Sequence, residues 1–212
     1  MPSLYLIRHA QSMANANSHL ICGRSNESPI TPLGERQAHA LGAYLKDESI
    51  TFDEVYTSPA LRTRETARIV CGHIGFPIER IVESDMVQEL SQGDWVGRDR
   101  RTIYTPELKQ IINLNNHDFK APGGESQREV EERMTAWAKY AVIDQHANDN
   151  ANIALFGHGL AIKCFLRGVF GWHPSNTYVI DFPNTSISHI VYGTKEWYLQ
   201  FLNRTGHLLD VK

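Results

Sequence analysis

The 212-residue sequence contains little cysteine. Its three cysteines, Cys22, Cys71 and Cys164, lie far apart and include no Cys-x-x-Cys pair. This spacing argues against a disulfide framework, and no local His/Cys spacing supplies the three or four ligands of a zinc site. The pattern is typical of reduced thiols, and it predicts a cytoplasmic protein without a bound metal.

The sequence also lacks an excess of charge of one sign. It has 21 Lys and Arg residues against 24 Asp and Glu residues, for a formal net charge of -3. A protein that binds nucleic acid by covering its phosphates carries a strong positive balance, so we expect no nucleic-acid partner. A small basic pocket inside a nearly neutral molecule is compatible with the same composition.

Long apolar runs are absent as well. The most apolar stretch, residues 153–172, is interrupted by His158, Lys163, Arg167 and four glycines, and a membrane span needs about 20 apolar residues. The apolar residues 4–7 near the N-terminus are too few for the apolar region of a signal peptide. We therefore expect neither a membrane partner nor export.

What the sequence does contain is an alternation of short apolar runs with longer segments of helical period, which is typical of an α/β protein with a mainly parallel sheet. Strands are predicted at 4–7, 54–57, 81–82 and 152–156, helices at 33–47, 60–73, 126–146 and 160–170, and a terminal hairpin at 188–192 and 197–202. The length suits a single domain over 1–212. Residues 91–124, rich in Gly, Pro and Asn, are predicted to be a lid or insertion without regular periodicity.

Two of the predicted strands run directly into a histidine. The first ends at Arg8 and His9, and the fourth ends at His158 between two glycines. Ligands of open α/β sheets bind at the carboxyl ends of the strands, so both histidines are expected to meet in one site. The guanidinium groups of Arg8 and Arg62 match the oxygens of a phosphate ester. A neutral His9 is a competent nucleophile toward phosphorus, and His158, if protonated, would stabilise the transferring oxygens.

Five segments in order carry a resemblance to a known family. They are Leu6-Ile7-Arg8-His9-Ala10-Gln11-Ser12 with Asn15, Ser58-Pro59-Ala60-Leu61-Arg62-Thr63, Glu89 followed by Gly93, Trp95 and Gly97, Pro122-Gly123-Gly124-Glu125-Ser126, and Gly157-His158-Gly159. Together they span nearly the whole chain, which resembles the histidine phosphatase superfamily, also called the phosphoglycerate mutase-like family. The resemblance implies a three-layer α/β/α sandwich with a mostly parallel sheet.

The resemblance also implies roles for single residues. His9 would be phosphorylated, and Glu89 would protonate the leaving alcohol and later activate water. The implied phosphate pocket consists of Arg8, Arg62, His158 and Asn15, with Gly23, Arg24 and Gly159 as further substrate or phosphate contacts. For Arg24, a contact with a second anionic group of the substrate and an ordinary loop salt bridge are equally good hypotheses. No metal or organic cofactor is implied.

The sequence departs from the family at the first motif, which usually reads Arg-His-Gly-Glu. Ala10 should be tolerated if its φ is negative, and Gln11 removes a negative charge near the pocket. The usual acidic residue after the tryptophan is replaced by Val96, and the basic run 98–101 follows. We expect these changes to affect the region that contacts the leaving group.

The favoured activity is phosphatase rather than mutase. Glu89 is followed by a compact segment instead of the longer mutase insertion, so the resemblance favours a histidine acid phosphatase-type phosphoric monoester hydrolase acting on a small phosphorylated metabolite. A cofactor-dependent phosphoglycerate mutase and a non-catalytic phosphate-binding module remain the alternatives.

The proposed reaction needs a neutral His9 and a protonated Glu89 at the same time. This requirement predicts a bell-shaped dependence of the rate on pH, on the acidic-to-neutral side. The sequence identifies neither the natural substrate nor the oligomeric state, for which a homodimer is one possibility.

Overall fold

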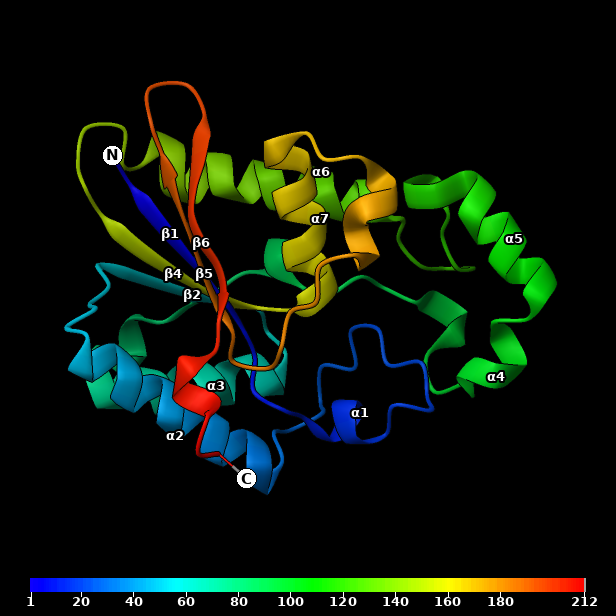
Figure 1. Ribbon diagram of the computed structural model, residues 1–212, viewed down its shortest axis with the longest axis horizontal. Coiled ribbons are helices and arrows are strands. Elements are labelled where there is room, and N and C mark those ends of the chain that lie inside the picture. The colour runs from blue at the N-terminus through cyan, green and yellow to red at the C-terminus, as the bar shows by residue number, and fades with distance from the viewer. Residues whose placement is uncertain (212) are drawn as a thin grey trace.

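The computed structural model describes residues 1–211 and contains one six-stranded sheet. Figure 1 shows this sheet nearly edge-on. The strands are β1 (Ser3–Arg8), β2 (Glu54–Thr57), β3 (Val82–Glu83), β4 (Asn152–Gly157), β5 (Ile187–Tyr192) and β6 (Trp197–Arg204). Their order is β3-β2-β4-β1-β5-β6, in which β1 to β4 are parallel while β5 and β6 form the antiparallel hairpin. The prediction of a mainly parallel sheet is confirmed.

Helices cover both faces of this sheet. The α-helices of residues 1–211 are α1 (Met13–Ala16), α2 (Pro32–Asp47), α3 (Leu61–Ile74), α4 (Arg100–Ile103), α5 (Pro106–Asn115), α6 (Gln127–Ala138) and α7 (Gly159–Phe170). Figure 1 shows α2 and α3 on one face and α6 and α7 on the other. The three-layer α/β/α sandwich is therefore confirmed.

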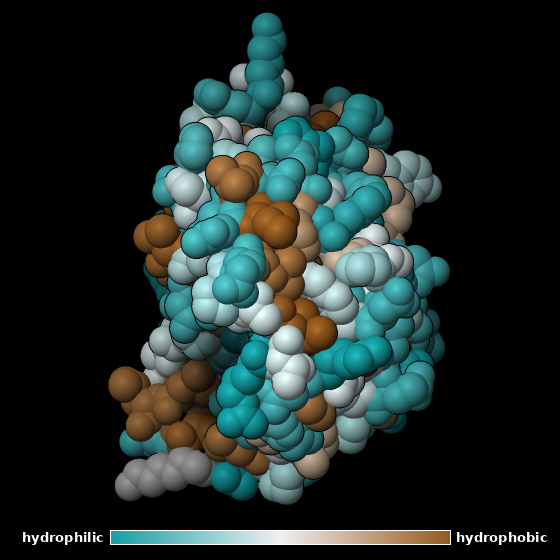
Figure 2. Space-filling model, turned by 90° about the vertical axis from the view of Figure 1, so that its right-hand side faces the viewer, coloured by the Kyte–Doolittle hydropathy of each residue, from teal (hydrophilic) through white to brown (hydrophobic). Residues whose placement is uncertain are grey.

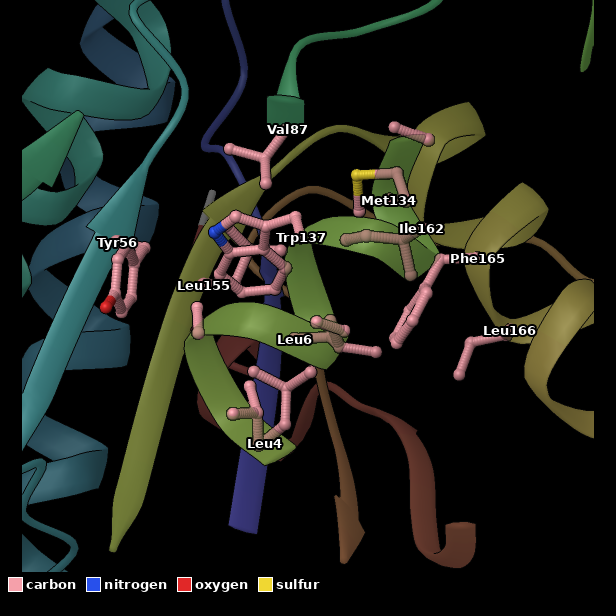
Figure 3. Packing of buried hydrophobic residues seen from close by; sticks show 14 of the residues in the cluster. Leu4, Leu6, Tyr56, Val87, Met134, Trp137, Leu155, Ile162, Phe165 and Leu166 are labelled. Carbon is pink, nitrogen blue, oxygen red and sulfur yellow. The ribbon is translucent and has the colours of Figure 1, made fainter. Parts of the chain in front are cut away.

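Each face of the sheet has its own apolar core. Side chains alternate between the two faces along a strand, so Leu4 and Leu6 of β1 join the core under α6 and α7 while Ile7 joins the core under α2 and α3. Figure 3 shows Leu6 together with Trp137 and Phe165 in the first of these cores. Each fully buried side chain of this size contributes roughly 1.5–3 kcal/mol, so β1 is held firmly where it leads into the site.

The helix predicted at 126–146 is an α-helix over only part of this range. Its start is set by Ser126, whose side chain accepts from the Glu129 amide while the Glu129 carboxylate accepts from the Ser126 amide. The α-helix ends at Ala138 and continues as a π-helix over Lys139–Asp144. This wider turn keeps Ala141 and Val142 buried in the core, which explains why the apolar spacing predicted one long helix.

The segment 91–124 is more regular than the sequence predicted, because it contains α4 and α5. Thr105 caps α5 and Pro106 occupies its first turn, and Leu108, Ile111 and Ile112 have helical spacing, although no residue of α5 is buried. The sequence prediction missed this signal. The segment is held partly by Trp95, whose ring lies 5.7 Å from that of Tyr104 and 5.8 Å from that of Phe119. It lies beyond the sheet at the end of the molecule that Figure 2 views, where a band of apolar residues crosses a mostly polar surface.

Over residues 1–211, no helix is both long enough and apolar enough to cross a membrane.

Candidate active site

The two histidines predicted to share a site lie side by side. β1 and β4 are adjacent and parallel, with Arg8 in register with Gly157, and the His9 amide donates to the Gly157 carbonyl at 2.9 Å. His9 and His158 are both buried, and their ring centroids are 5.3 Å apart at an angle of 63°. The register of two neighbouring strands therefore brings together His9 and His158, which lie far apart in the sequence.

His9 is held as a neutral imidazole with one free nitrogen. Its Nδ1 lies 2.7 Å from the Ala10 carbonyl, which can only accept, so Nδ1 carries the proton and Nε2 has the lone pair. Burial, followed by the charges of Arg62 and Arg8, holds the pKa of His9 well below 6.5. This is the protonation state that a nucleophile toward phosphorus requires.

Two guanidinium groups lie near His9, that of Arg62 buried and that of Arg8 half-buried. Arg62 donates from Nη1 to the Ser25 carbonyl at 2.8 Å and from Nη2 to the Arg24 carbonyl at 2.9 Å. Arg8 donates from Nη1 to the Phe182 carbonyl, while its Nε is buried without a partner. Within residues 1–211, neither arginine forms an ion pair with a carboxylate.

Removing a guanidinium group from water without a carboxylate partner is costly. Burial lowers the pKa of both Arg8 and Arg62, and the nearby charge of Glu89 partly opposes the shift in each case. An isolated buried charge costs several kcal/mol after relaxation. A dianionic ligand placed between the two guanidinium groups would offset this cost, so the pocket is complementary to a phosphate group.

His158 differs from the expectation that it acts as a cation. Its Nδ1 accepts from Arg62 Nη2 at 3.1 Å, so this nitrogen has no proton, and its Nε2 donates to the Ser58 hydroxyl at 2.8 Å. Burial, together with the charge of Arg62, holds the pKa of His158 well below 6.5. In this structure the positive charge of the pocket therefore belongs to the arginines, and His158 orients Arg62. Ser58 belongs to a motif used for the resemblance, but sequence reasoning did not identify it as a partner of His158.

Glu89 lies against the start of α7, the helix that directly follows His158. Its Oε1 accepts from the amides of Leu90 at 2.8 Å and Ala161 at 3.0 Å, and its Oε2 accepts from the Leu160 amide at 3.2 Å. The exposed amides at a helix N-terminus favour a negative group. The structure thus brings the predicted carboxylate to the same strand end as the two histidines.

Asn15 is occupied by contacts within the protein. Its Oδ1 accepts from the Ser12 amide at 3.1 Å and from Asn184 Nδ2 at 3.2 Å. Asn184 Nδ2 also donates to the His9 carbonyl at 2.9 Å. Asn184 was missed by sequence reasoning, and it belongs to none of the five segments that carry the resemblance. A direct contact of Asn15 with phosphate stays a prediction.

The remaining predicted contacts surround the arginines. A Cβ on Gly159 would lie 3.3 Å from Arg8 Nε, so glycine there allows Arg8 to approach the backbone closely. Gly23 has a φ of +50° and packs against Gln92. Arg24 Nη2 lies 3.1 Å from Glu125 Oε1, which supports the salt-bridge hypothesis for Arg24 over a direct substrate contact.

The altered first motif fits its surroundings without strain. Ala10 is fully buried, is not among the residues with positive φ, and donates from its amide to Thr66 Oγ1 at 3.0 Å. Gln11 accepts through Oε1 from the Thr31 hydroxyl at 2.8 Å, next to the start of α2. The neutral amide therefore has a structural partner of its own.

The fold and this site define a class of protein. The sequence profile of the histidine phosphatase superfamily (branch 1) matches residues 4–205, and the chain belongs to this family. It is an enzyme of the phosphatase or mutase type that the family contains.

One relative by sequence and two solved structures show what this chain is similar to. The probable phosphoglycerate mutase GpmB of Yersinia enterocolitica is 32% identical over 201 residues, which cover 93% of this chain and 88% of the relative. Among solved structures, Bacillus stearothermophilus YhfR has a TM-score of 0.84 at 23% identity, covering 98% of this chain and all of its own. The phosphoserine phosphatase of Entamoeba histolytica in complex with 3-phosphoglyceric acid has a TM-score of 0.79 at 23% identity, covering 99% and 100%. These structures confirm the fold.

The buried neutral histidines predict a loss of stability in acid. The pKa of His9 and that of His158 lie well below 6.5 in the folded protein and return to about 6.5 on unfolding. Below pH 6.5 the unfolded chain therefore binds more protons than the folded chain, and the free energy of unfolding falls as the pH falls. Each ring contributes at most about 1.4 kcal/mol per pH unit.

Urea unfolding of the wild type and of His9→Asn between about pH 5 and 7.5 measures this effect. We expect a shallower loss of stability with acidification in His9→Asn, because one such ring is gone. Other histidines titrate in both proteins and cancel in the comparison. Identical slopes would show that His9 is not buried in its neutral form.

Proposed function

We propose that the protein hydrolyses the phosphomonoester of a small phosphorylated metabolite through a phosphohistidine intermediate on His9. The observation that carries this proposal is the grouping of Arg8, His9 and Arg62. Arg62 is buried and Arg8 is half-buried, neither pairs with a carboxylate among residues 1–211, and both lie near a neutral His9 whose Nδ1 is held by the Ala10 carbonyl. Such a group of residues combines donors for a dianion with a nucleophile.

The reaction proceeds in two displacements at phosphorus. His9 Nε2 attacks in line, the new N–P bond forms as the ester P–O bond breaks, and Glu89 gives its proton to the departing alcohol oxygen. Water then attacks the phosphohistidine, its proton passes to the Glu89 carboxylate, and the N–P bond breaks to release phosphate. Arg8 and Arg62 stabilise the charge on the non-transferring oxygens in both steps. This scheme uses no metal ion, and we propose a cytoplasmic enzyme.

The comparisons support hydrolysis in part. The Entamoeba protein is titled a phosphoserine phosphatase, and further solved structures of this fold are titled glucosyl-3-phosphoglycerate phosphatase and alpha-ribazole phosphatase. The relative from Yersinia is named a probable phosphoglycerate mutase, and this favours mutase activity as the second candidate. The compact segment that follows Glu89 favours the phosphatase.

Two assays separate the candidates. We expect release of phosphate from p-nitrophenyl phosphate, with an optimum on the acidic-to-neutral side because His9 stays neutral there. With 3-phosphoglycerate and 2,3-bisphosphoglycerate together, we expect phosphate release to be faster than isomerisation. Faster isomerisation would establish the mutase, and a folded protein inert toward all three esters over a range of pH would favour a binding module.

A further inference from the structure

Three charged residues hold the turn that carries Glu89, and of these only Arg24 belongs to the predicted site. They are Arg24, Glu125 and Arg133, which we call the Glu125 cluster. Glu125 lies just before α6, Arg133 lies within α6, and Arg24 lies in the loop that also contacts Arg62. None of them was assigned a role in positioning the acid by the sequence.

Glu125 is the centre of this cluster. Its Oε1 accepts from Arg133 Nε at 3.0 Å and pairs with Arg24 Nη2 at 3.1 Å. Its Oε2 accepts from Arg133 Nη2 at 3.2 Å and from the Ser91 amide at 3.0 Å. The side chains of Glu125 and Arg133 are only 18% and 16% exposed, so this two-pronged pair is shielded from water. Burial alone would raise the pKa of Glu125, but the hydrogen bonds of Arg133 and Ser91 keep it below its usual value.

The cluster reaches Glu89 through its main chain. Arg133 donates from Nη2 to the Glu89 carbonyl at 3.2 Å and from Nη1 to the Met86 carbonyl at 2.8 Å. Arg24 Nε donates to the same Glu89 carbonyl at 3.4 Å. Glu125 also accepts from the Ser91 amide. The turn that carries Glu89 is therefore held at Met86 before it, at Glu89 itself and at Ser91 after it.

We propose that Glu125 and Arg133 are positioning residues for Glu89. They hold its backbone from one side while the amides of Leu160 and Ala161 hold its carboxylate from the other. The carboxyl group is thereby kept at the start of α7, beside His158, where the leaving oxygen of a phosphate bound by Arg8 and Arg62 departs. This inference rests on the proposed function, in which Glu89 protonates the leaving group.

Lysine at position 133 separates positioning from charge. Arg133→Lys keeps the positive charge, but a single ammonium group cannot contact Glu125, Met86 and Glu89 together. A displacement of about 1 Å of a reacting group costs up to about 10²-fold in rate. Arg128→Lys is the matched control, because Arg128 lies on the same helix and pairs with Asp118, away from Glu89.

The test compares two esters that differ in their need for an acid. The alkoxide of glycerol 2-phosphate is a poor leaving group and needs a proton, whereas p-nitrophenolate departs without one. The parameter kcat/KM covers the steps up to alcohol release, so it reports only the step in which Glu89 acts as an acid. We expect Arg133→Lys to lower kcat/KM for glycerol 2-phosphate by about 10- to 100-fold and for p-nitrophenyl phosphate by less than about threefold. Arg128→Lys should change neither.

Glu89→Gln separates a failure of the proposed function from a failure of the positioning role. It should show the same selectivity for the alkyl ester, with a loss of about 10²–10⁴. If Glu89→Gln lowers both esters equally, the acid role of Glu89 is wrong and the inference falls with it. If Glu89→Gln is selective but Arg133→Lys is not, the proposed function stands and the positioning role is overturned. Glu125→Gln, which replaces one acceptor oxygen by a donor facing Ser91 and Arg133, gives the same readout if Arg133→Lys fails to fold.

Discussion

Replacing His9 by asparagine should abolish hydrolysis of p-nitrophenyl phosphate, with a loss in kcat of at least about 10⁴-fold. Asparagine retains an amide that can donate to the Ala10 carbonyl, so the contact that orients His9 is preserved. What disappears is Nε2, the nitrogen whose lone pair forms the bond to phosphorus. Because His9 is already neutral, the substitution removes no charge from the pocket. The loss is therefore one of nucleophile rather than of binding.

Two further measurements make this result specific. His39→Asn is the matched control, because His39 is an exposed histidine of α2 whose Nδ1 lies 2.9 Å from Nε2 of His73 in α3. The activity of His39→Asn should equal that of the wild type. The wild type, quenched during turnover, should carry an acid-labile phosphoryl group that mass spectrometry assigns to His9. A His9→Asn protein with more than a few per cent of wild-type activity would contradict the phosphohistidine mechanism.

Arg62→Lys should lower kcat/KM for the same ester by about 10²–10³-fold. The guanidinium fork of Arg62 donates to the carbonyls of Ser25 and Arg24 and to the Nδ1 of His158. Lysine keeps the charge but presents a single ammonium group on a flexible stem, so paired donation to phosphate oxygens is lost. His158 also loses the donor that fixes its tautomer.

Binding of inorganic phosphate provides an independent measurement. At a phosphate concentration of about 100 times Kd, the wild type should gain about 2.7 kcal/mol of stability, seen as a rise in Tm. Arg62→Lys should show a much smaller rise. Arg68→Lys, an exposed arginine on the same helix, should behave as the wild type. An undiminished phosphate effect in Arg62→Lys would remove Arg62 from the proposed pocket.

Much of the fold was predictable because its signals are local. The apolar run 4–7 predicted a strand, and Thr31-Pro32 and Ser126 marked helix starts, all of which the structure confirms. The segment 91–124 was not predictable in this way. Its Gly, Pro and Asn residues masked the start signal Thr105-Pro106 and the helical spacing of Leu108, Ile111 and Ile112, and no residue of α5 is buried.

The residues of the candidate site were likewise predictable only where their signal in the sequence is local. Strand ends followed by histidine and arginine indicated Arg8, His9 and His158, since strand order and direction alone bring such residues to one edge. Asn184 and Arg133 were not recognised, because each acts on a backbone carbonyl far away in the sequence. No local pattern marks a side chain whose partner is a distant main-chain atom.

The sequence by itself determined the class of fold, the histidines and arginines of the pocket, and the acidic residue that accompanies them. Only the tertiary structure decided their states: His9 neutral with Nε2 free, His158 neutral with Nδ1 accepting from Arg62, and Arg24 paired with Glu125. The physical reason is that composition and period report which side chains are buried or presented. Protonation and hydrogen-bond direction depend on the burial and the neighbouring charges that folding assembles around each group. A near-neutral chain of net charge -3 thus brings a buried and a half-buried guanidinium group close to a neutral imidazole.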